Sequence, residues 1–177
     1  MNEQLYTEIP ECPEHYTAGT VLGRIVDGLG FRYRWATDGL TERDLDYRSS
    51  ESCRSIIETL SHIHNLVLMT TTGFSGERYS LPEPPETKPF NELRQATLMQ
   101  VRQLSEQLKA TSNEKFDEMP VRFKMGDDNL DFPFWNAING TVADALYHVG
   151  QVVSHRRAAG NPIDPQVNVF IGKKMDT

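Results

Sequence analysis

Five polar side chains recur at intervals of three and four residues in the last third of the 177-residue chain: Thr141, Asp144, His148, Gln151 and His155. At about 3.6 residues per turn, this spacing places them in one narrow stripe along a helix. Asp144 and His148 are one turn apart, so both side chains can reach the same cation. The stripe therefore predicts a metal site. A direct hydrogen bond between Asp144 and His148, without a metal, is the alternative interpretation.

The helix that carries this stripe has almost no charged residues. Between Asp131 and His155, the only formally charged residue is Asp144. A surface helix normally carries several Lys and Glu residues on the side that faces water. We therefore expect this helix to be mostly buried, where a carboxylate needs a partner because its desolvation is unfavourable. A metal ion is one such partner.

A metal ion inside a helical bundle needs a further ligand from a facing helix. The helix expected over residues 51–72 contains His62 and His64, which point in roughly opposite directions because they are two residues apart. His64 belongs to the apolar face of that helix, whereas His62 shares a polar stripe with Glu58. We therefore predict His62 as the third ligand, with Glu58 as an acceptor that orients its ring.

The remaining histidine of the stripe is placed outside the metal site. His155 follows His148 by two helical turns, which is about 10 Å along the axis. We expect it to support the site from a distance or to lie at the mouth of the bundle. Cys53 lies on the other side of its helix from His62, so a Cys–His nucleophile has little support. Phosphate-binding loops, zincin motifs and Cys-x-x-Cys pairs are missing from the sequence.

Four long amphipathic segments predict the elements that position these residues. An all-α four-helix bundle is the expected fold, as a single domain over residues 1–177. Its second helix is expected to begin after a cap at Ser49 or Ser50. Alternating apolar residues before the last helix predict a short β-hairpin over residues 121–132, with a four-residue turn at 126–129. Residues 74–89 contain four prolines and are predicted as a loop, and the tail after Gly160 is expected to be ordered. The helices are expected at approximately 16–37, 51–72, 91–111 and 133–159.

Composition excludes several classes of function. The formal net charge of −7 disfavours nucleic acid and anionic membrane surfaces as partners. No apolar run approaches the roughly 20 residues needed to cross a bilayer, and the first residues do not form a signal peptide. Two cysteines are too few for a disulfide scaffold, so reduced thiols and a cytoplasmic location are expected.

Three short motifs resemble the DinB/YfiT-like family of metal-binding four-helix bundles. Residues 56–63, which include His62, resemble the histidine element of the family's second helix. Residues 144–151 resemble the His-x-x-x-His-Arg-Gly-Gln element of its fourth helix, and residues 39–45 resemble the link after its first helix. This chain has Asp144 where the family typically has a histidine. The resemblance implies a metal site of His62, Asp144 and His148.

The resemblance also implies an activity, namely a metal-dependent hydrolase or thiol transferase acting on a small molecule, a thiol being one option. Zinc, nickel and iron all accept imidazole and carboxylate ligands, so the metal is not fixed by the ligand types. Gln151 and Glu58 are then expected to position water or substrate, covered by the hairpin or the 74–89 loop.

Three other expectations stay open at this point. The chain can instead be a non-catalytic, stress-related bundle that binds a ligand or partner, with Asp144 paired directly to a histidine. Two histidines and one carboxylate also match the ligands of non-haem Fe(II) oxygenases. Finally, the uncharged back of the last helix predicts a homodimer interface through Asn136, Ala143, Gly150 and Ser154.

Overall fold

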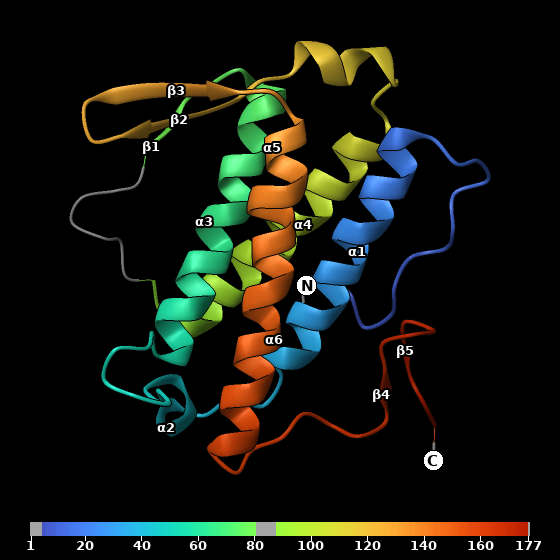
Figure 1. Ribbon diagram of the computed structural model, residues 1–177. Coiled ribbons are helices and arrows are strands. Elements are labelled where there is room, and N and C mark those ends of the chain that lie inside the picture. Colours follow the sequence, from blue (N-terminus) through green and yellow to red (C-terminus); the bar gives the residue numbers. More distant parts are fainter. Residues whose placement is uncertain (1–4, 81–87, 177) are drawn as a thin grey trace.

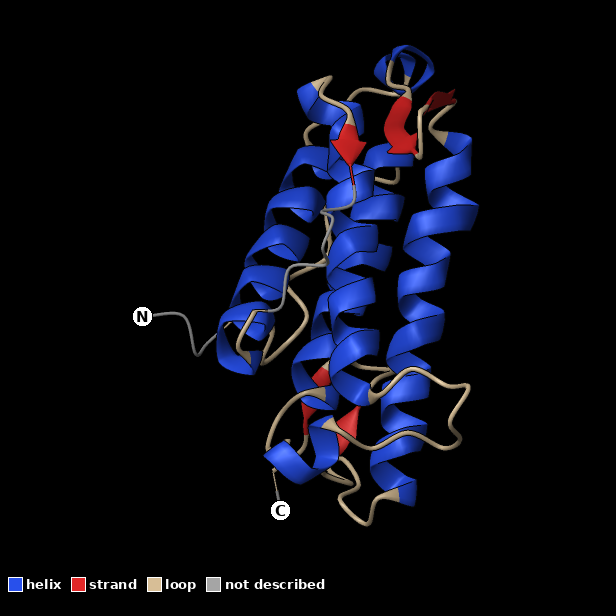
Figure 2. Cartoon of the chain, turned by 90° about the vertical axis from the view of Figure 1, so that its left-hand side faces the viewer, coloured by secondary structure: helices blue, strands red, loops and turns tan. Residues whose placement is uncertain are grey.

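The computed structural model describes residues 5–80 and 88–176, and it shows a four-helix bundle (Figures 1 and 2). The helix α1 neighbours α4 and α6, and α3 neighbours the same two helices from the opposite corner. In Figure 1, α1 and α6 run in one direction, and α3 and α4 run in the other. The predicted all-α four-helix bundle is therefore confirmed. The long helices are α1 (Ala18–Ala36), α3 (Ile56–Ser75), α4 (Phe90–Lys109) and the consecutive segments α5 (Trp135–Ala137), η2 (Ile138–Val142) and α6 (Ala143–Ala158).

The second long helix, α3, begins later than the sequence pattern indicated. Its cap is Ser55, whose hydroxyl accepts from the Glu58 N–H, while the Glu58 carboxylate accepts from the Ser55 N–H at 2.7 Å. This reciprocal capping box fixes the first turn, so the predicted start at residue 51 is wrong. The helix ends at Gly76 in a left-handed conformation, with φ of 71°. The predicted 74–89 loop therefore begins later than expected, and residues 81–87 of it lie outside the described residues.

The predicted β-hairpin is present and carries a third short strand. β2 (Val121–Met125) and β3 (Asp128–Phe132) pair antiparallel, and β1 (Tyr79–Ser80) pairs parallel to β2. Met125 lies opposite Asp128, so the turn has two residues rather than the predicted four. A positive φ of 60° at Gly126 allows this tighter turn. Shorter elements are α2 (Glu42–Leu45), the 3-10 helix η1 (Glu114–Glu118), β4 (Val167–Asn168) and β5 (Lys173–Lys174).

The helices α1 and α4 approach each other closely. A Cβ atom at Gly19 would overlap the Leu108 carbonyl oxygen, so only glycine permits this backbone contact. Apolar side chains from all four long helices fill the space between them and form one core. The largest fully buried members include Leu29, Tyr33, Ile56, Leu60, Ile63, Leu104 and Leu108.

A buried ion pair joins the same two helices. Asp27 on α1 is 1% exposed and pairs with the Lys109 ammonium on α4. The Ser105 hydroxyl donates to the same carboxylate at 2.6 Å, and the Tyr6 hydroxyl donates to it at 3.1 Å. The amino-terminal arm is therefore attached to the bundle through this carboxylate.

One face of the last helix is exposed, contrary to the sequence-based expectation of a mostly buried helix. Trp135 and Tyr147 are 72% and 65% exposed. The helix packs mainly on α1 and α3, which leaves its outer side in solvent although that side has few charges. Among the described residues, no helix is long and apolar enough to span a membrane. The residues predicted for a homodimer interface are all exposed: Asn136, Ala143, Gly150 and Ser154.

The carboxyl-terminal tail is ordered, as expected, and a buried arginine attaches its start to the bundle. The guanidinium of Arg156, in a residue only 3% exposed, donates to the carbonyl oxygens of Trp35, Ala36 and Asp38 at 3.2, 3.1 and 2.8 Å. It also donates to the carbonyl oxygen of Asn161 at 2.8 Å. Arg156 therefore joins the end of α1 to the end of α6, where unpaired helical carbonyls need donors.

Candidate metal centre

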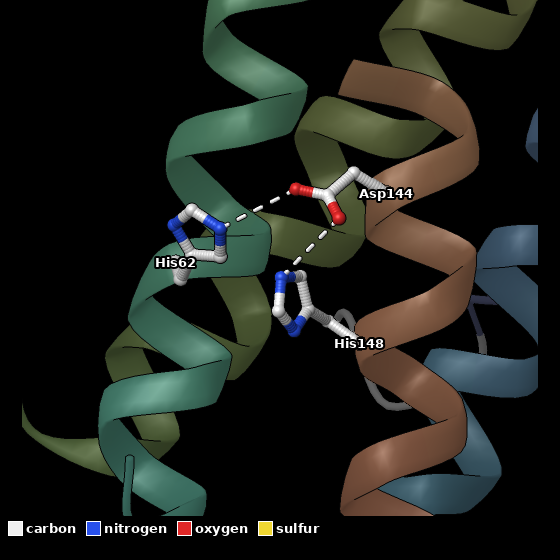
Figure 3. A group of neighbouring side chains, drawn as sticks. All are labelled: His62, Asp144 and His148. Carbon is white, nitrogen blue, oxygen red and sulfur yellow. Dashed lines mark ion pairs between the residues drawn. The ribbon is translucent and has the colours of Figure 1, made fainter. Parts of the chain in front are cut away.

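Helix α3 and the α5–α6 helix bring His62, Asp144 and His148 together in the space between them (Figure 3). His62 lies two turns after the Ser55 cap, so the capping box sets the position at which its ring meets α6. Asp144 lies in the first turn of α6, with His148 one turn later. The ligand atoms of all three residues lie within 4.8 Å of one another. The structure thus brings together the three residues predicted from the sequence.

A π-helical turn precedes the site on the last helix. The segment η2 ends at Val142, two residues before Asp144. π-helical turns are rare and occur frequently at functional sites. The Thr141 hydroxyl within this turn lies 2.6 Å from the Thr70 hydroxyl of α3, in a buried contact. Thr141 of the polar stripe is therefore a link between the two helices above the site.

The two imidazoles face opposite oxygens of one carboxylate. His62 Nε2 lies 3.5 Å from Asp144 Oδ2, and His148 Nε2 lies 3.4 Å from Asp144 Oδ1. The two rings meet edge to face, with centroids 4.6 Å apart and planes at 83°. Figure 3 shows both Nε2 atoms directed at the carboxylate.

The site opens towards solvent on the side of Asp144. The exposed fractions of the side chains are 9% for His148, 28% for His62 and 43% for Asp144. Burial, the positive charge of Arg54 and the neighbouring His148 lower the pKa of His62, although Asp144 opposes this shift. His62 therefore favours the neutral form, which is the form that binds a metal ion.

Gln151 fixes the tautomer of His148. Its Oε1 lies 2.7 Å from His148 Nδ1. An amide oxygen can only accept, so Nδ1 carries the proton and donates it. In the neutral ring, Nε2 then presents a lone pair to the Asp144 carboxylate. Gln151 was predicted to position water or substrate, and the structure shows a contact with His148 instead.

A lone pair on His148 Nε2 facing a carboxylate oxygen at 3.4 Å is unfavourable unless a cation lies between them. That cation is either a proton, which makes the ring an imidazolium, or a metal ion. Two imidazole nitrogens and one carboxylate are ligands that zinc, nickel and iron accept. Three protein ligands also leave coordination positions open, as a catalytic metal site requires. The donor set therefore fits a divalent metal ion, and the role of the three residues as ligands stays a prediction.

The Glu58 carboxylate makes contacts other than the one with His62 that the sequence predicted. Its carboxylate accepts from the Ser55 N–H and lies 3.3 Å from the Arg48 guanidinium, both beside the start of α3. These contacts hold it in the capping box, which explains why it does not act as the expected acceptor for the His62 ring. Its predicted role in positioning water or substrate has no contact in support within the described part of the chain.

The other two histidines considered from the sequence lie elsewhere. His64 is buried against α4, where its Nδ1 lies 3.1 Å from the Thr97 hydroxyl. His155 packs edge to face on Tyr47, with ring centroids 5.8 Å apart. Within residues 5–80 and 88–176, the structure groups only His62, Asp144 and His148 at metal-binding distances. Sequence reasoning missed the contact of Gln151 with His148, which an i, i+3 polar pair would have suggested.

The fold resembles two solved structures from Bacillus subtilis. One is the DinB-like protein YjoA, with 16% identity, a TM-score of 0.57 and coverage of 86% of this chain and 99% of that chain. The other is YfiT, with 12% identity, a TM-score of 0.53 and coverage of 90% and 99%, described as a probable metal-dependent hydrolase with an unusual four-helix bundle topology. No family model and no curated protein sequence matches. The resemblance noted from three short motifs is thus confirmed by the overall structure: the chain has the four-helix-bundle fold of the DinB-like and YfiT proteins.

Proposed function

We propose that this chain is a metal-dependent enzyme, a hydrolase or thiol transferase, with His62, Asp144 and His148 as the ligands of one divalent ion. The observation that carries the proposal is the relation between Gln151, His148 and Asp144. Gln151 accepts a hydrogen bond from the protonated Nδ1 of His148. The other ring nitrogen, Nε2, therefore directs a lone pair at the Asp144 carboxylate. A divalent metal ion held by His148 and Asp144 would replace this repulsion with attraction to both groups.

The two kinds of ligand would contribute differently to binding the ion. The two neutral imidazoles bind without adding charge, and the carboxylate offsets one of the two positive charges. A divalent metal bound here would supply Lewis acidity, which lowers the pKa of a water or thiol and polarises an electrophile. Asp144 is the most exposed of the three side chains, so substrate is expected to approach from its side. The description of the fold neighbour YfiT as a probable metal-dependent hydrolase agrees with this assignment.

The first test is metal content. Protein purified without chelators is expected to contain about one transition metal ion per chain, measured by mass spectrometry of the metal. His148→Ala should lose it, whereas His155→Ala on the same helix should keep it, because His155 packs on Tyr47. A wild-type protein that takes up no zinc, nickel or iron at neutral pH would overturn the proposal. It would support the non-catalytic bundle, in which a proton joins His148 to Asp144.

The second test is activity. Metal-loaded protein is assayed for ester and amide hydrolysis and for conjugation of low-molecular-weight thiols with electrophiles. Activity should disappear in His148→Ala and persist in His155→Ala. A protein that binds metal but has neither activity would leave only the binding part of the proposal.

The ligand set also favours a second candidate, a non-haem Fe(II) oxygenase. Two histidines and one carboxylate are the ligands of that class. Anaerobic loading with Fe(II), followed by measurement of oxygen uptake with candidate substrates, separates it from the first proposal. Activity with zinc and without oxygen uptake would exclude the oxygenase.

We also propose that the chain forms a homodimer through the exposed, uncharged face of the last helix. Trp135 and Tyr147 give this face large apolar area in solvent. Sedimentation equilibrium should show a dimer at micromolar concentration, and Ala143→Arg should shift it to monomer. A monomeric wild type contradicts this proposal.

A further inference from the structure

A cavity of about 530 Å³ lies between α1, α6 and the carboxyl-terminal tail. Its wall is formed by two residues of α1, six of α6 and three of the tail. Cavities of roughly 300–1,000 Å³ are the size at which proteins bind small organic molecules. The tail therefore borders a half-open space that is large enough for a ligand.

This cavity is separate from the candidate metal centre. The α6 residues in its wall include Val149, Val153 and Arg157, which recur every four residues along one side of the helix. Asp144 and His148 follow the same spacing on another line, about half a turn around the helix. The two sites therefore use opposite faces of α6.

The charge in the cavity wall is positive, in a chain whose net charge is −7. Arg32 and Arg157 both contribute to the wall, and no Asp or Glu does. Arg32 donates to the Gly28 carbonyl oxygen at 3.1 Å, which leaves most of its donors unused. Neither arginine forms an ion pair with a carboxylate of the residues that the structure describes. Two guanidinium groups without a carboxylate partner favour an anion in this space.

The rest of the wall is mostly apolar. Val149 and Val153 of α6 and Ile163 and Val167 of the tail all line the cavity. Trp35 adds its indole ring, whose N–H is buried and has no acceptor among the described residues. An anion with an apolar body therefore suits this wall better than an inorganic ion, because such a body can cover the valines and the indole.

We propose that this cavity binds a small organic carboxylate with an apolar body. Arg32 and Arg157 hold the carboxylate, and the body lies against Val149, Val153 and the tail. Guanidinium groups match the two oxygens of a carboxylate, and the apolar wall selects against short, fully polar acids such as acetate. The proposal is independent of the metal centre.

Tryptophan fluorescence provides the direct test. The chain contains two tryptophans, and Trp135→Phe removes the exposed one without touching the cavity. In this background, decanoate below its micellar concentration should change the emission of Trp35 with saturation. Decanol should bind at least about tenfold more weakly, because each charged hydrogen bond contributes on the order of a tenfold change in affinity. Acetate should give no response, and decyl phosphate serves as the probe for a phosphate headgroup instead of a carboxylate.

Three variants relate the binding to named residues. Arg32→Met and Arg157→Met keep the side-chain length and should each weaken decanoate binding about tenfold. Arg43→Met, at an exposed position of α2, is the matched control and should bind like the parent protein. Gly150→Leu should block the cavity, since a Cβ at Gly150 meets nothing within 4 Å, and leucine suits a helix better than glycine. Ala158→Leu, exposed on the same helix and outside the cavity wall, is its control.

The outcomes separate this proposal from the proposed enzyme. His148→Ala should bind decanoate with unchanged affinity, so loss of the metal leaves this site intact. Equal affinity for decanoate and decanol, or unchanged affinity in both arginine variants, would show an apolar cavity only and overturn the proposal. The absence of a saturable response to decanoate would overturn it as well. Tighter binding of decyl phosphate than of decanoate would contradict the choice of a carboxylate.

Discussion

Gln151 Oε1 accepts a hydrogen bond from His148 Nδ1 at 2.7 Å, across one turn of the last helix. This contact determines which ring nitrogen of His148 is directed towards Asp144. His148 is only 7% exposed, so water has little access to its ring. The amide thus leaves Nε2 as the nitrogen available to a metal ion. Partners of this kind orient metal-binding imidazoles in many proteins.

The first prediction concerns this amide. Gln151→Leu removes the acceptor and should weaken metal binding about 10–100-fold, because His148 can then adopt either tautomer. Gln151→Glu keeps an acceptor and should bind at least as tightly as the wild type. Competition with a chromophoric chelator measures both affinities. A Leu variant with wild-type affinity would show that Gln151 does not prepare the ligand.

The second prediction concerns the pH dependence of the metal-free protein. The pKa of His62 is lowered by burial from its ordinary value of 6.5, so the folded state takes up this proton less readily than the unfolded state. The unfolded state then binds more protons as the pH falls below about 6.5. The free energy of unfolding should therefore be unaffected by His62 above that pH and decrease on acidification below it.

Urea denaturation with a chelator present, at pH 7.5 and at intervals down to pH 5, measures this effect. His62→Gln removes the titrating group, so its unfolding free energy should fall less steeply than that of the wild type. Parallel pH profiles for the two proteins would contradict the predicted direction of the shift.

The third prediction concerns Arg156. Its guanidinium donates to carbonyl oxygens at the end of α1 and to Asn161, and the residue is only 3% exposed. Arg156→Met should lower the free energy of unfolding by about 3 kcal/mol, because buried acceptors lose a charged donor. Arg157→Met changes the exposed neighbour and should alter stability by no more than about 0.5 kcal/mol. Urea titrations measure the free energy of unfolding of both variants. Equal losses would show that the contacts of Arg156 add no more stability than those of Arg157.

The fourth prediction concerns the ion pair between α1 and α4. Lys109→Met leaves the carboxylate of Asp27 buried without its charge partner and should cost about 3 kcal/mol of unfolding free energy. The pair of Arg102 with Glu106 is exposed on the same helix, so Arg102→Met should cost less than about 1 kcal/mol. Thermal and urea unfolding measure both variants. Similar losses from the two would mean that the buried pair adds nothing beyond a surface pair.

The sequence alone determined the helix face on which the candidate metal ligands lie. Helical spacing put Asp144 and His148 on one stripe, and the polar pattern of the second helix selected His62 over His64. Both choices depend on a period that every regular helix shares, so they needed no knowledge of contacts. The structure brings these three residues together and turns His64 to Thr97.

The tertiary structure decided what the spacing left open. Several serines precede the second helix. Only Ser55 is followed three residues later by a glutamate, and the two form a reciprocal cap. The helix α3 therefore begins later than predicted, and the Glu58 side chain is held by the cap. Arg156 and Arg157 look alike in sequence, but one reaches the end of α1, and the other lines the cavity beside the tail. The Ser55 cap is a local contact that the Ser-x-x-Glu spacing already allows. The two arginines, in contrast, differ because of contacts between residues far apart in the chain. Local pattern carries no information about such contacts, because they depend on how the helices pack against one another.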